Sequence, residues 1–232
     1  MSRTLSVEYR LSASAPYTKA GQFPSGILDA LAGYVYLTRT LGFKPQNVIV
    51  AGDSAGGNLT LAFARYLRDN PELGIAAPGG LLLLSPWGDP TGNRPELALK
   101  QGKRVYESDY TGPSGDPRFS LGHYGIRSLI GDIPFDEAKK NVYISPASLE
   151  IDPSDVQGMF TGFPPIYLVS GEGEALLDEI RTLHQRMIAD MPREAVVYDE
   201  VADAVHDFTV FPFWEPERTD TFKRISAWIE QL

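Results

Sequence analysis

The chain contains no cysteine, which excludes disulfide bonds and thiolate metal ligands. It also lacks any apolar run approaching the ~20 residues that a membrane-spanning helix needs. The first twelve residues, MSRTLSVEYRLS, lack the apolar core of a signal peptide. We therefore predict no membrane segment and no signal peptide in this chain, which favours a cytoplasmic location.

Positive charge is scarce: the chain has 21 lysines and arginines but 30 aspartates and glutamates, which gives a net charge of −9. This balance disfavours nucleic acid as a partner and argues against binding to an anionic membrane surface. A hydrophobic content of 43% excludes a disordered chain. A length of 232 residues is compatible with one α/β domain, and nothing in the sequence indicates an oligomeric state.

Short apolar runs alternate with helical patterns along most of the chain. This alternation predicts a parallel sheet covered by helices on both faces. The expected strands are residues 4–10, 47–51, 79–85, 166–170 and 195–201. The expected helices are residues 24–41, 55–69, 176–189 and 219–231.

The stretch 87–163 has a different pattern, rich in glycine, proline, aspartate and aromatic residues, with one helical segment near 123–130. It is too long for a plain loop in a compact domain. We interpret it as a cap or lid inserted into a single domain, 1–232, whose core is about 1–86 and 164–232. A disordered loop is the alternative, which the aromatic residues disfavour: Tyr106, Tyr110, Phe119, Tyr124, Phe135 and Tyr143.

A serine between small residues follows the strand expected at 47–51 and precedes a helix. This strand–turn–helix context is typical of a nucleophile elbow, in which Ser54 is exposed at the sheet edge. A side chain near so sharp a turn would collide with the chain, and Gly52 and Gly56 carry none. The backbone N–H of Ala55 then points to the same spot and can stabilise an oxyanion.

A serine nucleophile needs a general base, and the chain has three histidines. His184 lies within an expected helix among charged residues and is interpreted as a solvated helix residue. His123 lies in the insertion and is interpreted as a capping or surface residue. His206 follows the last expected strand, where the carboxyl edge of the sheet presents side chains to a pocket. We predict that His206 is the base.

The acid that orients the base should follow the strand expected at 166–170. The candidates there are Glu172, Glu174, Asp178 and Glu179. Asp178 and Glu179 belong to the start of the next helix, where acids are favoured in any case. Glu174 lies in the turn, from which it can reach the loop of His206. The order Ser54, Glu174, His206 is that of the α/β-hydrolases.

At these residues the chain resembles the hormone-sensitive-lipase-like branch of the α/β-hydrolases, also called the α/β-hydrolase-3 group. Residues 52–59 match its G-D-S-A-G-G-N-L elbow at every position. Residues 174–178 keep the spacing of its D-P-L-x-D acid motif with glutamate first, and residues 206–208 resemble its H-G-F. The weaker matches are residues 9–11, 23–24, 29, 143–146 and 163–165.

The resemblance implies hydrolysis of carboxylic esters through an acyl-serine intermediate, without a metal or organic cofactor. The expected substrate is a small molecule, either a short or medium acyl ester or an ester of a small metabolite. The residues proposed to contact it are Asp53, Phe208, Phe211 and Trp214, with Phe213 beside them. For the aromatic residues, core packing is an equal alternative.

The largest departure from this family is that the chain has no H-G-G-G segment, whose N–H groups supply the rest of the oxyanion hole. The family's strand before that segment would lie between the strands expected at 4–10 and 47–51. We therefore expect an N-terminally truncated α/β-hydrolase with Ala55 as its remaining oxyanion donor. Two alternatives stay open, an impaired or inactive hydrolase and a ligand-binding module on the same fold.

Overall fold

The computed structural model describes residues 3–92, 109–111 and 121–232. Its sheet has the order β1-β2-β3-β4, and every pair of neighbours is parallel. The strands are β1 (Ile49–Asp53), β2 (Gly80–Leu84), β3 (Ile166–Gly171) and β4 (Val196–Val201). The predicted α/β class is confirmed, and each strand overlaps a run of apolar residues identified in the sequence.

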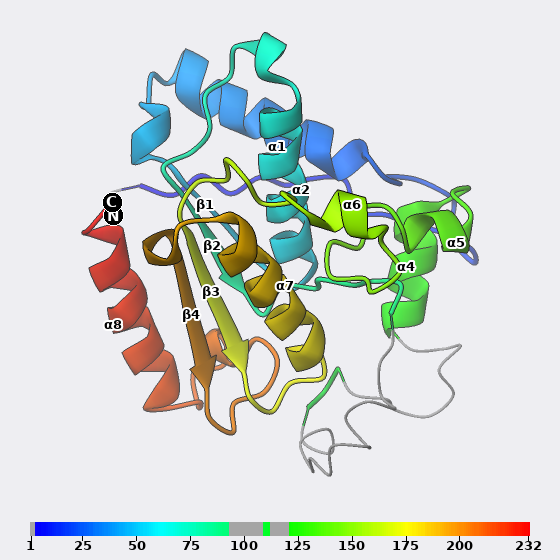
Figure 1. Cartoon of the computed structure of the whole chain (residues 1–232). Helices are drawn as coiled ribbons and strands as arrows, with labels where there is room; N and C mark the ends of the chain where they lie inside the picture. Colours follow the sequence, from blue (N-terminus) through cyan, green and yellow to red (C-terminus); the bar gives the residue numbers. More distant parts are fainter. Residues whose placement is uncertain (1–2, 93–108, 112–120) are drawn as a thin grey trace.

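Four longer helices accompany the sheet (Figure 1). They are α1 (Ser25–Val35), α2 (Ala55–Asp69), α7 (Leu177–Asp190) and α8 (Glu217–Ile229). α1 continues into a π-helical turn, Tyr36–Thr40, so that together they fill the helix expected at 24–41.

The two faces of the sheet carry separate apolar layers. Leu81 and Leu83 of β2 pack with residues of α2 and α7, whereas Leu82 packs on the opposite side with residues of α8. This alternation follows from the two-residue period of a strand. β2 and β3 are covered on both sides, which explains why they are continuous apolar runs in the sequence.

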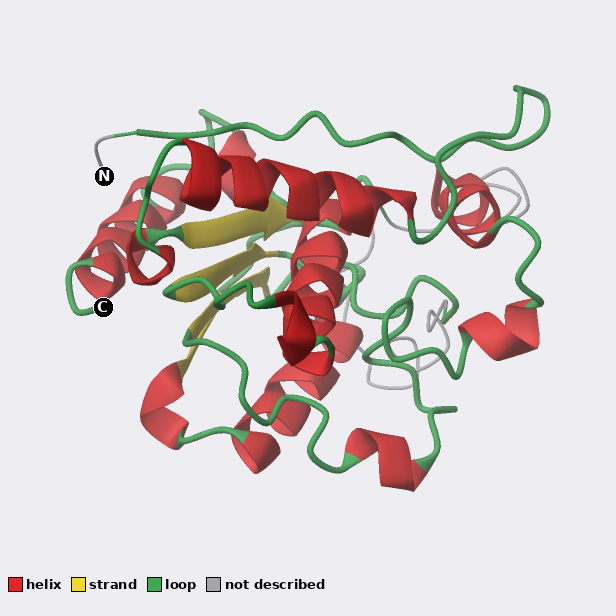
Figure 2. Ribbon diagram, turned by 90° about the horizontal axis from the view of Figure 1, so that it is seen from above, coloured by secondary structure: helices red, strands yellow, loops and turns green. Residues whose placement is uncertain are grey.

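The strand expected at 4–10 is wrong. Residues 3–10 form no strand, and they run along α1 (Figure 2). Arg10 is tied there to Asp29 of α1 at 2.8 Å, and Val7 lies against Gly33. The segment therefore has an alternating pattern without a neighbouring strand to pair with, and a ladder needs both. Within the described residues, β1 is consequently an edge strand.

The insertion is described in part, because residues 93–108 and 112–120, with Tyr106 and Phe119, lie outside the described residues. Its helices are α4 (Leu121–Ile130), which was predicted, and the short α5 (Phe135–Ala138) and α6 (Pro153–Val156), which were not. Ile126, Ile130, Ala138 and Ile144 form a small core here. The role of this stretch as a cap stays a prediction.

Candidate active site

Ser54 lies between the end of β1 and the first residue of α2. Its backbone has φ 49° and ψ −115°, a conformation that non-glycine residues rarely adopt and that costs free energy. Backbone hydrogen bonds hold it there. The N–H of Ser54 donates to the carbonyl of Leu84 at 2.9 Å, and its carbonyl accepts from the N–H of Trp87 at 2.9 Å. The strained turn presents the hydroxyl beyond the end of the strand.

The elbow depends on glycine at two positions. A Cβ on Gly52 would lie 2.1 Å from the carbonyl oxygen of Gly56, and one on Gly57 would lie 2.7 Å from Cβ of Pro86. A Cβ on Gly56 would have its nearest neighbour, a carboxylate oxygen of Asp53, at 4.0 Å. The prediction for Gly52 is therefore confirmed. The prediction for Gly56 is wrong, because a side chain on Gly56 would have no close neighbour, and this residue matters through the carbonyl oxygen that a side chain on Gly52 would strike.

His206 lies in the loop after β4 and faces the serine. Its Nε2 is 2.9 Å from Oγ of Ser54, which is hydrogen-bonding distance, and its side chain is buried. The other two histidines lie elsewhere. His184 contacts Tyr198, with ring centroids 4.5 Å apart, and His123 is on α4. The structure thus brings together the two residues, Ser54 and His206, that the sequence selected as nucleophile and base.

Glu174 is the predicted acid that approaches the far side of the imidazole. Its Oε2 is 3.6 Å from Nδ1 of His206 and accepts a hydrogen bond of 2.6 Å from the hydroxyl of Ser85. The carboxyl is fully buried, and this burial raises its pKa, an effect that His206 opposes. Ser85, which holds Glu174 in place, was missed because it is 89 residues away in sequence.

Another candidate acid, Glu179, is bonded to the backbone of a neighbouring loop. Glu179 accepts hydrogen bonds from the backbone N–H groups of Gly88 at 2.8 Å and Asp89 at 3.2 Å, which fixes the loop after β2. Across the part of the chain that the structure describes, the carboxylates within 4.0 Å of His206 are those of Glu174 and Asp207. The geometry therefore favours Glu174 over Glu172, Asp178 and Glu179.

Asp207 introduces a second carboxylate at the base. Its Oδ2 lies 3.3 Å from Nε2 of His206, the same nitrogen that faces Ser54. Burial raises the pKa of Asp207 to about 7, an effect that His206 opposes and that the carboxylate of Asp53 reinforces. Burial alone would lower the pKa of His206, but the carboxylates of Glu174 and Asp207 outweigh it and raise that pKa.

The sequence contained a signal for Asp207, because it stands where the H-G-F motif has glycine. Its backbone φ of 51° is in the left-handed region that favours glycine, so the turn is kept although the residue differs. What the motif could not give is the direction of the side chain, which points back to the imidazole.

A described piece of the insertion also reaches the site. The carboxylate of Asp109 accepts from the N–H of Ala175 at 2.5 Å, next to Glu174. The ring of Tyr110 lies with its centroid 5.7 Å from His206 and 5.7 Å from Phe211. Tyr110 was noted in the sequence as an aromatic residue of the insertion, but not as a neighbour of His206.

The residues proposed to contact substrate divide into two groups. Phe208 is fully buried and packs in the core beneath α8, and Trp214 packs against the same core. Packing, the alternative left open for the aromatic residues, therefore accounts for Phe208. Phe211 is half-buried beside Tyr110, and Asp53 is exposed at the end of β1. For these two residues, contact with a substrate stays a prediction.

Neither a metal site nor a membrane span is found in the described ranges. No group of three or more histidine, aspartate or glutamate side chains there could hold a metal ion. Among the same residues, none of the helices combines the length and the apolar character that crossing a bilayer requires.

Comparison with known proteins gives concordant matches. The sequence model of the Abhydrolase_3 family, described as alpha/beta hydrolase fold, matches residues 2–210. An esterase of Acinetobacter venetianus is 26% identical over 99% of this chain and 65% of its own length. An acetyl-hydrolase of Streptomyces hygroscopicus is 28% identical over 87% of this chain and 56% of its own.

Among solved structures, a hormone-sensitive lipase from a metagenome library superposes with a TM-score of 0.67. It is 26% identical, and the match covers 93% of this chain and 65% of that protein. The chain therefore spans less than two thirds of the length of each of these three proteins.

Proposed function

This chain belongs to the Abhydrolase_3 family of the α/β-hydrolase fold, and from that premise we propose that it hydrolyses carboxylic esters with Ser54, His206 and Glu174. The observation that carries the proposal is the 2.9 Å contact between Nε2 of His206 and Oγ of Ser54 at a strained strand–helix turn. Names of relatives, esterase and acetyl-hydrolase, support the same reaction class.

In the first half-reaction, Oγ of Ser54 attacks the ester carbonyl carbon while its proton passes to Nε2 of His206. The carbonyl oxygen becomes an oxyanion and accepts from the N–H of Ala55, which as the first residue of α2 has no acceptor within the helix. The tetrahedral intermediate collapses, and His206 returns the proton to the departing alcohol. An acyl-serine remains.

In the second half-reaction, a water molecule attacks the acyl carbonyl as His206 removes its proton. The acid leaves, and Ser54 regains its hydrogen from His206. Through both halves the carboxylate of Glu174 stabilises the imidazolium and orients the ring from the Nδ1 side, and Ser85 orients Glu174 in turn.

The substrate that we propose is a short or medium acyl ester, or an ester of a small metabolite. Tyr110 and Phe211 provide an aromatic wall beside the reacting pair. Asp53, at the exposed end of β1, is placed to meet a polar group of the substrate.

One observation favours a second candidate, a hydrolase impaired in turnover. Asp207 lies 3.3 Å from the nitrogen of His206 that must exchange protons with Ser54 and with the leaving group. A carboxylate there competes for that proton. A protein of this kind would still acylate with a reactive reagent, but it would turn over slowly.

A fluorophosphonate probe tests the proposal, because it reacts with an activated serine whether or not turnover is fast. We expect the wild-type protein to be labelled and Ser54→Ala not to be. The same variant should hydrolyse p-nitrophenyl acetate more slowly by a factor of at least ~10³. His206→Ala should lose both in the same way, whereas His184→Ala should retain them.

The outcomes separate the candidates. Labelling with hydrolysis supports the esterase, and labelling without hydrolysis supports the impaired hydrolase. A folded protein that does not label at all would overturn both and favour a ligand-binding role.

A further inference from the structure

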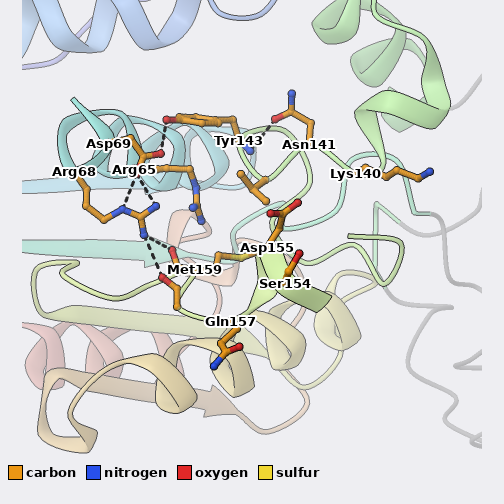
Figure 3. Close-up of a pocket in the computed structure, with 12 residues that line it drawn as sticks. Arg65, Arg68, Asp69, Lys140, Asn141, Tyr143, Ser154, Asp155, Gln157 and Met159 are labelled. Carbon is orange, nitrogen blue, oxygen red and sulfur yellow. Dashed lines mark hydrogen bonds and ion pairs between the residues drawn. The ribbon is translucent and has the colours of Figure 1, made fainter. Parts of the chain in front are cut away.

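A cavity lies away from the catalytic pair, between α2 and the segments around α6. It has a volume of about 510 Å³, within the range of small-molecule sites. Figure 3 shows the side chains around it. The charged residues that line it are Arg65, Arg68, Asp69, Lys140 and Asp155.

Arg65 is the unusual member of this group. It is 3% exposed, yet no hydrogen bond or ion pair joins its guanidinium to another described residue, and no dashed line reaches it in Figure 3. Its neighbours are aromatic, with the guanidinium carbon 5.7 Å from the ring centroid of Tyr143 and 5.6 Å from that of Phe163. Cation–π contacts stabilise the charge but leave the N–H donors unused.

These donors meet the cavity. The side-chain polar atoms that are sealed from solvent without a partner in the described residues belong to Glu174, His206 and Asp207, and none belongs to Arg65. The nitrogens of Arg65 therefore reach the open space that it lines. Burial lowers its pKa to about 10, so the side chain stays cationic at neutral pH.

The neighbouring charges are already paired or lie at the rim. Arg68 is bound to Asp69 at 2.6 Å and donates to the carbonyl of Met159 at 2.6 Å. Asp69 also accepts from the hydroxyl of Tyr143 at 2.7 Å. Asp155 is exposed, and so is Gln157 beside it. Asp69, the acid with the larger effect on the pKa of Arg65, is thus already paired with Arg68. Asp190, the other acid that raises this pKa, accepts from the backbone N–H groups of Gly158 and Phe160 at 2.9 Å each.

We propose that this cavity is a binding site for an oxyanion, a carboxylate or a phosphate group, held by the guanidinium of Arg65. The planar fork of arginine presents parallel N–H donors that match the oxygens of such groups. The site is separate from the esterase centre, since Arg65 follows Ser54 by eleven residues and is therefore ~16 Å along α2.

Binding can be measured by thermal unfolding with inorganic phosphate and, separately, acetate, each at constant ionic strength set by NaCl. At ten times the dissociation constant we expect Tm to rise by about 3–6 °C. The anion that raises Tm more at the same concentration shows whether the site prefers a tetrahedral or a planar group. The same rise should occur in Ser54→Ala, because the catalytic centre is not involved.

Variants at the rim give a signed test without disturbing the buried arginine. Asp155→Asn removes a negative charge and should tighten binding several-fold, whereas Gln157→Glu adds one and should weaken it several-fold. Arg65→Met should abolish the response.

Unchanged affinity in both rim variants would overturn the proposal, even if Arg65→Met fails to fold. So would an unchanged Tm when phosphate or acetate replaces chloride at constant ionic strength.

Discussion

At the scale of single residues, the site differs from the expected triad by the carboxylate of Asp207. Oδ2 of Asp207 and Oγ of Ser54 both lie near Nε2 of His206, at 3.3 Å and 2.9 Å. Glu174 lies on the other side of the ring. The imidazole is therefore placed between two carboxylates, which together favour its protonated form and oppose the role of base that we propose for it.

Replacement of Asp207 by asparagine should shift the pH profile of ester hydrolysis. Because the charge of Asp207 raises the pKa of His206, its removal lowers that pKa and leaves more neutral imidazole at acidic pH. We expect the rising limb of kcat/KM to move to lower pH and the rate below its midpoint to increase several-fold. An unmoved limb would show that Asp207 does not influence the base.

The same variant should change the pH dependence of stability. An aspartate with a pKa of about 7 when folded and about 4 when unfolded binds protons more tightly in the folded state. The contribution of Asp207 to the free energy of unfolding is fully present below pH ~4 and is lost as the pH rises through ~7. The unfolding free energy of Asp207→Asn relative to that of the wild type should therefore increase by at least about 1 kcal/mol from pH 5 to pH 8. Urea unfolding of both proteins at the two pH values measures this change. A difference independent of pH would contradict this.

At the scale of elements, the strand–turn–helix unit of β1 and α2 does most to position the chemistry. Gly52 and Gly57 allow the backbones of the strand, the helix and the following loop to approach closely. Asn58 then ties α2 to the loop after β2 and to the insertion, donating to the carbonyls of Trp87 and Ile144 at 2.9 Å each. Contacts with β1, with the loop after β2 and with the insertion therefore fix this turn, which keeps Ser54 in its strained conformation.

Two glycine-to-alanine variants test this account of the elbow. Gly52→Ala forces a methyl to within 2.1 Å of a carbonyl oxygen, so we expect a loss of about 1–3 kcal/mol in unfolding free energy and a large drop in fluorophosphonate labelling. Gly56→Ala has no neighbour closer than 4.0 Å and should change stability by less than about 1 kcal/mol. Equal effects of the two variants would contradict the steric explanation.

At the scale of the whole molecule, one sheet separates two apolar layers and carries the site at its carboxyl edge. Ser54, Glu174 and His206 follow β1, β3 and β4, so the parallel topology brings them together. The central strands are sealed on both sides, with Leu168 of β3 fully buried between β2 and β4. Packing of this sheet therefore fixes the distances within the site.

Leu168→Ala should reveal this dependence. Truncation in a sealed core costs about 2–5 kcal/mol, which for a chain of this size lowers Tm by roughly 5–15 °C. Leu149→Ala is the matched control, because that side chain is 65% exposed and its loss should change stability by less than about 0.5 kcal/mol. Differential scanning calorimetry of both variants measures the contrast, and similar Tm values for the two would contradict it.

Most of the sheet and helices could be predicted because their patterns are local. The buried run at 79–85 and the helix at 55–69 need no knowledge of distant residues, and the structure has β2 and α2 there. The segment 4–10 has an equally clear alternation, but a strand also requires a neighbour, which lies outside any local pattern. Short helices such as α5 and α6 leave too few residues for a period to show.

The sequence by itself determined the family resemblance, the elbow and the residue types at the reacting pair, because these depend on short motifs and on a choice among three histidines. Position in the turn after the third strand had already favoured Glu174 as the acid, and the structure places it beside His206. Tertiary structure alone decided that Ser85 bonds to Glu174, that Tyr110 lies beside His206, and where Arg65 is buried. Each of those outcomes depends on side chains far apart in the sequence that the fold brings within a few ångströms. Motif spacing records the backbone turns, but contacts across the molecule are set only when the layers pack.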